Sequence, residues 1–313
     1  MIKKKTLFVL GAGASMPYGF PSGAELREHI CSAHTGGRPL VNAVVNGCGV
    51  SPEHVEKFRD SFLRSSLPSI DAFLAKRPEF AEVGKLAIAY ELCRRESPGR
   101  VIRPEGDDNW YKHLWAAMSW DAHGPAVLRN NQIRFVTFNY DRSLEFFLHE
   151  STKHSYGLDD AEALDAWKPI QILHVYGSLG EFHYLANDTA RPYKPATDEN
   201  TLRLAARALK VIPDARQGDI AFSMASEWLT WADTVCFLGF GFDRLNMERL
   251  GVSTTLELLR SNGAKTPRIV ASTWGKTPSE VEAVRQVHLK GPLDFFSLDQ
   301  QNLMTLRNTG ILD

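Results

Sequence analysis

The part of the sequence that decides the fold reads Lys5-Thr6-Leu7-Phe8-Val9-Leu10-Gly11-Ala12-Gly13-Ala14-Ser15. An apolar run of strand-forming residues leads into two glycines separated by one residue, which is typical of a buried parallel strand that ends in a tight turn. Glycine adopts backbone angles that other residues avoid, and its missing side chain lets a phosphate approach the backbone amides. Amides at the start of a following helix also favour negative charge. The stretch therefore predicts a strand and a phosphate-binding turn, with a plain strand-to-helix turn as the alternative.

Length and composition are those of an ordinary globular protein. The chain has 313 residues, 43% hydrophobic and 23% charged, so we expect a sizeable core in one large domain or two smaller ones. A formal net charge of -1 gives no support for binding nucleic acid or a membrane surface by bulk electrostatics. The apolar run after the lysines at 3–5 is too short for a signal peptide, and no run approaches the ~20 apolar residues of a membrane span. We expect a cytoplasmic protein that binds neither membranes nor nucleic acid directly.

The cysteines are far apart in the sequence, and no Cys-x-x-Cys pair occurs. A zinc ribbon and a disulfide framework are therefore both unmotivated, and the histidines show no metal-ligand spacing either. We expect free thiols, with Cys236 in the core because it lies in an apolar run, and no metal site. The four cysteines are Cys31, Cys48, Cys93 and Cys236.

Strand-like and helix-like segments alternate along the rest of the chain. Between about residues 40 and 130 the apolar residues have helical spacing, interrupted by Pro and Gly, which predicts a mostly helical insertion over one edge of the sheet. The alternation elsewhere predicts an α/β fold with a doubly wound parallel sheet of about six strands. The further predicted strands are 133–138, 170–176, 234–238, 268–272 and 294–298. The predicted helices include 24–32, 51–63, 69–75, 83–95, 110–118, 141–149, 199–209, 221–232, 254–260 and 279–287.

Small and polar residues follow most of the predicted strands. In doubly wound sheets, ligands bind outside the carboxyl ends of the strands, where the winding direction reverses. We therefore expect these segments to meet in one crevice, although glycine also occurs at strand ends simply to turn the chain. The segments are Gly11–Ser15, Asn139–Asp141, Gly177-Ser178, Gly239–Asp243 and Ser272-Thr273.

A hydride-transfer enzyme is the first alternative for such a turn. Its Gly-x-Gly-x-x-Gly fingerprint requires a third glycine where this chain has Met16. It also requires an acidic residue about 20 positions further on, at the end of a second strand. Glu25 and Glu28 fall in a predicted helix instead. The sequence therefore fits a dehydrogenase poorly.

Several short motifs occur in the order found in sirtuins, and the chain more specifically resembles the sirtuin-like domains of bacterial anti-phage NADases. The resemblance spans residue 5 to about 275. It implies a single Rossmann-type NAD-binding domain over residues 1–313, with a helical insertion at about 40–130. The motifs are Gly11-Ala12-Gly13-Ala14-Ser15, Tyr18-Gly19-Phe20-Pro21-Ser22-Gly23, Thr137-Phe138-Asn139-Tyr140-Asp141, His174-Val175-Tyr176-Gly177-Ser178-Leu179 and Leu238-Gly239-Phe240-Gly241.

The same resemblance implies an NAD molecule extended along the strand ends. The glycine turn would hold the pyrophosphate, Asn139 would face the nicotinamide ribose and Asp141 the nicotinamide carboxamide. Gly239, Gly241 and the Ser272-Thr273 segment would face the adenosine half. The residues implied in NAD binding are Gly11, Ala12, Gly13, Ala14, Ser15, Pro21, Gly177, Ser178, Gly239, Gly241, Asp243 and Thr273.

The chain departs from the sirtuin pattern in three places. It lacks the four zinc-binding cysteines of the protein deacylases, and its Phe20–Gly23 loop lacks their Asp-Phe-Arg segment; both departures favour NAD hydrolysis over removal of acyl groups from lysine. The catalytic histidine of the family stands directly before the glycine, where this chain has Tyr176. His174 lies two residues earlier, on the same face of the strand. We hypothesise that His174 is the base, with Tyr176 as the second candidate.

The expected chemistry resembles glycoside hydrolysis. Cleavage of the nicotinamide–ribose bond passes through an oxocarbenium-like centre, and the pyridinium is already a good leaving group. The site must position water and accept a proton. The Asn139 amide both donates and accepts, and the pKa of a histidine is near ~6.5. The structural alternatives are that Asn139 only caps a helix, that His174 is a core histidine, and that Asp71 only contributes to a helix start.

The resulting hypothesis is an NAD glycohydrolase that releases nicotinamide and ADP-ribose and depletes NAD during anti-phage defence. No sensor domain is evident, so activity would be switched by homo-oligomerisation or by a separately encoded partner such as an ATPase or nuclease subunit. Two alternatives stay open: a non-catalytic module that binds NAD or ADP-ribose and regulates an assembly, and a protein deacylase that works without zinc.

Overall fold

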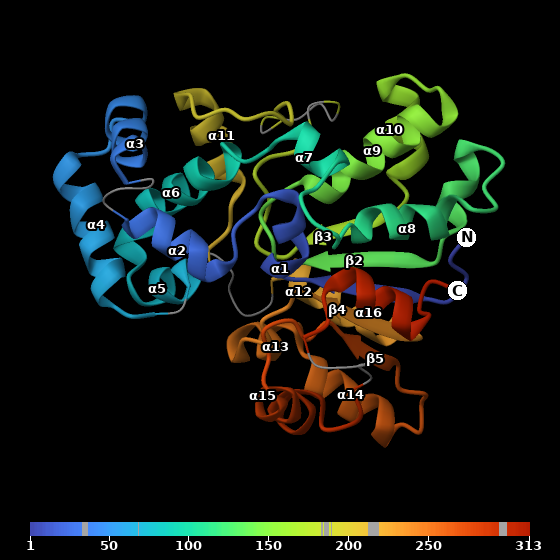
Figure 1. Cartoon of the computed structure of the whole chain (residues 1–313). Coiled ribbons are helices and arrows are strands. Elements are labelled where there is room, and N and C mark those ends of the chain that lie inside the picture. Colours follow the sequence, from blue (N-terminus) through green and yellow to red (C-terminus); the bar gives the residue numbers. More distant parts are fainter. Residues whose placement is uncertain are drawn as a thin grey trace.

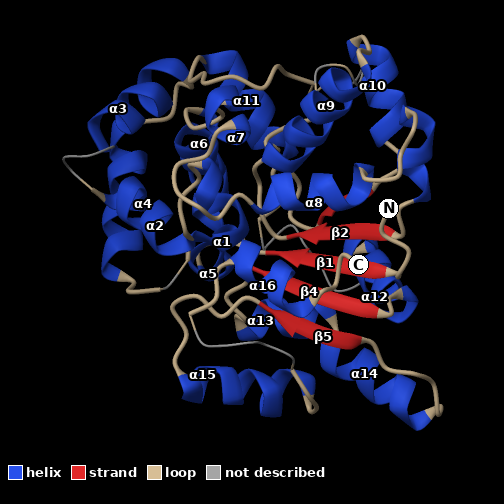
Figure 2. Ribbon diagram, turned by 45° about the vertical axis from the view of Figure 1, so that its right-hand side comes forward, coloured by secondary structure: helices blue, strands red, loops and turns tan. Residues whose placement is uncertain are grey.

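The computed structural model describes residues 1–32, 37–67, 69–182, 184, 188, 190–211, 219–293 and 299–313. Its centre is a parallel sheet of five strands in the order β3-β2-β1-β4-β5. Figure 2 shows β2, β1, β4 and β5 side by side. The predicted sheet had about six strands; the predicted strand 294–298 lies outside the described residues. The strands are β1 (Thr6–Leu10), β2 (Ile133–Thr137), β3 (Gln171–His174), β4 (Thr234–Leu238) and β5 (Arg268–Ala271).

The first strand lies in the middle of the sheet and is buried along its whole length. Leu10, its last residue, is paired with Thr137 of β2 on one side and with Leu238 of β4 on the other. Strands that are covered on both faces read as continuous apolar runs, which is why β1 and β4 were recognisable from the sequence. The chain continues to β2 and β3 on one side of β1 and to β4 and β5 on the other. The carboxyl ends of β1 and β4 are therefore the point where the winding reverses.

Helices cover both faces of the sheet. On one face α8 packs against α9 and α16, and on the other α12 packs against α13 and α14 (Figures 1 and 2). The structure confirms the α/β class with a parallel, Rossmann-like sheet. The helices are α8 (Trp110–Ser119), α9 (Ser143–Tyr156), α10 (Asp160–Trp167), α12 (Ile220–Trp231), α13 (Arg244–Leu250), α14 (Val252–Ser261), α15 (Pro278–Ala283) and α16 (Asn302–Thr309).

Every described element between β1 and β2 is a helix, and most of these helices gather at one side of the sheet (Figure 1). The sequence of α6 is apolar nearly all round, and the helix is buried between α2, α4, α5 and α11. The insertion therefore shares the hydrophobic core of the rest of the chain. Its helices are α1 (Ala12–Ser15), α2 (Gly23–Cys31), α3 (Gly37–Asn42), α4 (Pro52–Arg64), α5 (Ile70–Lys76), α6 (Ala81–Cys93) and α7 (Pro98–Ile102), with α11 (Glu199–Ala208) beside them. Short 3₁₀ or π turns are η1 (Met16–Tyr18), η2 (Ala43–Gly47), η3 (Pro78–Phe80), η4 (Pro125–Asn130) and η5 (Val284–Leu289).

Side-chain caps fix where two of these helices begin. Ser22 caps α2: its hydroxyl accepts from the Glu25 amide at 3.2 Å, and its own amide donates to the Glu25 carboxylate at 2.8 Å. Ser69 caps α5 by accepting from the Ala72 amide at 3.2 Å. This cap places Asp71 in the first turn of α5.

Three further observations bear on the predicted class of protein. None of the described helices has both the length and the apolar character that crossing a bilayer requires. The four cysteines are free thiols, and Cys236 is fully buried in β4 as predicted. Among the described residues, no three His, Cys, Asp or Glu side chains are placed to hold a metal ion.

Candidate functional site

The glycine turn after β1 packs directly against the turn after β4. The Gly11 amide donates to the Leu238 carbonyl and the Gly13 amide to the Gly239 carbonyl, both at 3.0 Å. Gly239 has a φ of +55°, and a Cβ there would lie 1.9 Å from the Ala14 nitrogen. The glycines are thus required by the contact between two turns, whatever binds there. The same contact occupies the amides of Gly11 and Gly13, which were predicted to bind phosphate.

Two cavities adjoin this turn. The Asn139 cavity has a volume of about 350 Å³ and the Trp274 cavity about 530 Å³. The first is lined by residues that include Gly11, Ala12, Ser15, Pro21, Asp71, Asn139, Tyr140, Asp141, Gly241, Asp243 and Asn246. The second is lined by residues that include Ala12, Gly13, Met16, Pro17, Glu105, Asp107, Asp108, Gly239, Gly241, Ser272, Trp274, Lys276 and Asn302. Ala12, Ser22, Gly23, Phe240 and Gly241 line both, so the two cavities are contiguous across the turn.

Asn139 joins the end of β2 to the glycine turn. Its side-chain nitrogen donates to the Gly11 carbonyl at 2.8 Å and to the Ser15 hydroxyl at 3.0 Å. A carbonyl only accepts, so the contact with Gly11 fixes which end of the amide is nitrogen. Both protons are used, and the oxygen Oδ1 is the side-chain group left for a ligand. The alternative that Asn139 caps a helix is wrong, because α9 begins at Ser143 and has no side-chain cap from Asn139.

Asp141 lies at the base of the same cavity. One of its carboxylate oxygens accepts from the Ser143 amide at 3.1 Å and from the Ser143 hydroxyl. Burial raises the pKa of Asp141, while hydrogen bonds from Ser143 and Ser15 oppose the rise. The carboxylate is thus held in a fixed orientation beside Asn139.

His174 is placed behind Asn139 and does not line the Asn139 cavity. Its Nδ1 lies 2.9 Å from the Asn139 carbonyl oxygen and its Nε2 lies 2.5 Å from the Glu145 carboxylate. Both partners are acceptors, so the ring is satisfied when both nitrogens carry protons. Burial lowers the pKa of His174, but the charge of Glu145 and both hydrogen bonds raise it, and the net direction is upward. An imidazolium with no free nitrogen suits a positioning role for the Asn139 backbone better than the role of base.

This pair gives the protein a pH-dependent stability. A histidine whose pKa is raised by folding contributes stability in full below its unfolded pKa, about 6.5, and loses it as pH rises through the folded pKa. We therefore expect the free energy of unfolding of the native protein to exceed that of Glu145→Gln most near pH 6, with the difference shrinking toward alkaline pH. Urea unfolding of both proteins across this range measures the difference. A difference that grows with pH contradicts the charged pair.

Tyr176, the second candidate base, is engaged elsewhere. Its hydroxyl donates to Asn246 Oδ1 at 2.8 Å and accepts from Arg249 at 3.1 Å. Burial raises the pKa of Tyr176 to about 12, although Arg249 lowers it in part. Its ring packs edge-on against Phe138 and Phe222 and lines neither cavity. Tyr176 is therefore a neutral packing residue that holds Asn246 at the cavity wall.

Several residues predicted to bind NAD line neither cavity. Ala14 is buried, and its carbonyl accepts from the Trp110 indole at 2.8 Å. Gly177 has a φ of +70° and turns the chain against the end of α11, where a Cβ would lie 2.1 Å from the Ala208 oxygen. Ser178 and Thr273 are also absent from both linings.

Asp71 enters the Asn139 cavity from the helical insertion, far from Asn139 in the sequence. The Tyr140 hydroxyl donates to its carboxylate at 2.5 Å. Burial raises the pKa of Asp71 although this hydrogen bond lowers it. With Asp141 and Asp243, it gives the cavity three carboxylates beside the amide oxygen of Asn139. The helix-start signal around Ser69 was visible in the sequence, but nothing local showed that this helix reaches the strand ends.

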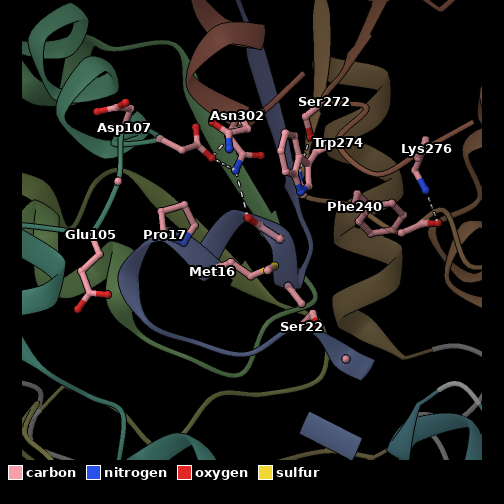
Figure 3. Close-up of a pocket in the computed structure, with 18 residues that line it drawn as sticks. Met16, Pro17, Ser22, Glu105, Asp107, Phe240, Ser272, Trp274, Lys276 and Asn302 are labelled. Carbon is pink, nitrogen blue, oxygen red and sulfur yellow. Dashed lines mark hydrogen bonds between the residues drawn. The ribbon is translucent and has the colours of Figure 1, made fainter. Parts of the chain in front are cut away.

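The Trp274 cavity combines predicted strand-end residues, among them Gly13, Gly239 and Ser272, with residues that the sequence did not single out, among them Asp107, Trp274 and Asn302 (Figure 3). The Trp274 amide donates to the Gln300 carbonyl at 3.1 Å, while the Trp274 side chain is 61% exposed at the cavity. Asn302, at the start of α16, donates from Nδ2 to the Gly13 carbonyl at 3.1 Å and to Asp108 at 2.8 Å. The hydrogen bond to Gln300 fixes the backbone of Trp274, and its exposed indole lines the cavity. The carboxamide of Asn302, which is bonded to the glycine turn, lines the same cavity.

Comparison with known proteins gives no further identification. No protein-family model matches the chain, and no curated protein matches it. The proposed function therefore rests on the geometry of the two cavities.

Proposed function

We propose that the protein is an NAD glycohydrolase that binds one NAD across the glycine turn, with nicotinamide in the Asn139 cavity and adenosine in the Trp274 cavity. The observation that carries the proposal is the pair of contiguous cavities at the point where the winding reverses. A dinucleotide, whose two halves are joined by a pyrophosphate, can place one half in each of two adjoining cavities. Each cavity is also within the size range of small-molecule sites.

The acidic side chains of the Asn139 cavity support the placement of nicotinamide there. Three carboxylates line it, and a pyridinium cation and an oxocarbenium-like transition state both carry positive charge. Fixed negative groups stabilise charge that develops on the ribose without reorganising during the step. A hydride-transfer site has no comparable need for such an arrangement.

The reaction itself is a displacement at the ribose carbon C1′. The bond from C1′ to the nicotinamide nitrogen breaks, and its electron pair leaves with the now neutral nicotinamide. A water oxygen forms the new bond to C1′ and gives up one proton. Asn139 Oδ1 is the acceptor that would orient the water or a ribose hydroxyl, since both of its nitrogen protons are used within the protein. Asp71 is the half-buried carboxylate in position to take the proton.

Replacing Asp71 with Asn tests this assignment. The amide keeps the shape and can still accept from Tyr140, but it carries no charge and cannot take a proton. We expect kcat for nicotinamide release to fall by about 100-fold, with little change in melting temperature. Asp198→Asn is the matched control, because Asp198 caps α11 and lines neither cavity. Equal activity of the Asp71 and Asp198 variants removes Asp71 from the mechanism.

A non-catalytic module that binds NAD or ADP-ribose is the second candidate. It is favoured by one observation: both ring nitrogens of His174, the hypothesised base, are engaged within the protein. Chromatography of NAD incubated with the protein separates the two, since only the hydrolase releases nicotinamide. The resemblance to sirtuins also leaves zinc-free deacylation as a candidate, and an acyl-lysine peptide tests it.

The biological setting rests on the resemblance alone. We propose NAD depletion in anti-phage defence, with activity switched by homo-oligomerisation or by a separately encoded ATPase or nuclease partner. Light scattering with and without NAD tests the first switch: a change in mass that accompanies activity is the expected result.

A further inference from the structure

Tyr140 connects the Asn139 cavity to the helical insertion. It follows Asn139 in the chain, is 6% exposed and lines the same cavity. Its hydroxyl donates to Asp71 Oδ1 at 2.5 Å and so joins the segment after β2 to the first turn of α5. An ionised carboxylate only accepts hydrogen bonds, so the tyrosine is the donor in this pair. A hydrogen bond donated to a carboxylate favours its ionised form over its protonated form.

The backbone at Tyr140 is held on both sides. The Asn139 carbonyl, in the peptide that leads into Tyr140, lies 2.9 Å from His174 Nδ1. The Tyr140 carbonyl accepts from the Leu179 amide at 2.8 Å. Asp71, in contrast, belongs to a helix of seven residues in the insertion. The fixed strand end therefore supplies a donor that determines where the Asp71 carboxylate points.

The groups around Asp71 act on its charge in opposite directions. Burial is the largest influence on the pKa of Asp71 and raises it, and the hydrogen bond from Tyr140 is the largest influence that lowers it. Among the charged groups, Arg249 of α13 also lowers the pKa, and Asp243, which precedes α13, raises it. Tyr176 faces Asp71 from the segment after β3, and the charge of Asp71 raises the pKa of that tyrosine. The Tyr140 hydroxyl is thus the main group that opposes the effect of burial.

We propose that Tyr140 is a positioning residue for the hydrolysis: its hydroxyl orients Asp71 and holds it in the ionised form that takes the proton from the attacking water. The inference rests on the proposed function, which gives Asp71 that role. A base works only in its unprotonated form, so kcat rises with pH through the pKa of Asp71 in the enzyme–substrate complex. Loss of the hydrogen bond from Tyr140 raises this pKa. The low-pH limb of the kcat profile then moves toward higher pH.

Tyr140→Phe tests this role, because it removes the hydroxyl and keeps the ring. We expect the midpoint of the low-pH limb of kcat for nicotinamide release to rise by about one pH unit or more, the size expected for a lost hydrogen bond to a charged group. On the high-pH plateau kcat should fall by less than about tenfold. Tyr156→Phe is the matched control, because the Tyr156 hydroxyl donates to the Ala122 carbonyl at 3.2 Å and Tyr156 lines neither cavity. The limb should not move in that variant. A lower plateau with an unmoved limb in Tyr140→Phe overturns the inference, because Tyr140 would then only pack.

A titration without turnover separates this inference from the proposed function. Carbon-13 NMR of protein labelled at the aspartate carboxyl carbons follows Asp71, whose signal is identified by its loss in Asp71→Asn. We expect this signal to titrate at higher pH in Tyr140→Phe than in the native protein, and at the native pH in Tyr156→Phe. An unchanged titration in a folded Tyr140→Phe overturns the inference, whether or not NAD is hydrolysed. If the native protein releases no nicotinamide, the proposed function fails and the role of Tyr140 in hydrolysis fails with it, while the titration still shows whether Tyr140 controls the charge of Asp71.

Discussion

Replacing Asn139 with Ala is expected to lower the rate of nicotinamide release from NAD by about 100-fold or more. Asn139 has two tasks in the proposed reaction: its oxygen orients the attacking water or a ribose hydroxyl, and its nitrogen fixes the end of β2 against the glycine turn. A misplacement of the reacting groups by about 1 Å can cost on the order of 10²-fold in rate. Steady-state release of nicotinamide, followed by chromatography, measures the effect.

Asn246→Ala is the matched control, because it removes a second carboxamide from the same cavity. The Asn246 side chain accepts a hydrogen bond from the Tyr176 hydroxyl, and Asn246 has no part in the proposed reaction. We expect a loss smaller than tenfold there. Affinity for ADP-ribose and the melting temperature of both variants show whether the site is still folded. Full activity of Asn139→Ala with an intact fold contradicts the mechanism.

The largest expected effect on stability comes from Glu96. This carboxylate is fully buried and lies 2.9 Å from Arg142 and 2.7 Å from Arg191, which are also buried. Arg142 further donates to the Glu181 carbonyl at 2.8 Å, so the network ties the loop after β3 to the segment that follows Asp141. Glu96→Ala leaves two buried cations without a counter-charge, and we expect it to lower the free energy of unfolding by about 3–5 kcal/mol. Urea unfolding measures this.

Glu248→Ala serves as the comparison, because the ion pair of Glu248 with Arg244 on α13 is exposed to solvent. Exposed pairs of this kind contribute little, so stability should hardly change. A Glu96 variant that unfolds at the same urea concentration as the Glu248 variant shows that the buried network does not hold the strand ends together.

The sequence predicted the sheet well because its signals are local. Apolar runs that end in glycine or polar residues marked the described strands, and their alternation with helices indicated winding on both sides of β1. The third strand was predicted over 170–176 but spans Gln171–His174. Helix α10 was missed although Asp159 and Glu162 form a capping box at its start, a signal that is visible in the sequence.

The site was predictable only where it consists of strand ends. Asn139 and Asp141 line a cavity beside the glycine turn, as expected from their position after β2. Asp71 enters the Asn139 cavity from the insertion, and Asn302 reaches the glycine turn from α16; no local pattern reports such long-range contacts. The engagement of His174 with Glu145 depends likewise on how α9 packs against β3.

The most direct test of the central claim is a crystal structure of the Asn139→Ala variant with NAD, in which the slowed reaction preserves the ligand. We expect one NAD across the glycine turn, with its nicotinamide beside Asp71 and Asp141 and its adenine at Trp274. Density for NAD anywhere else on the protein, or in the reverse orientation, contradicts the account.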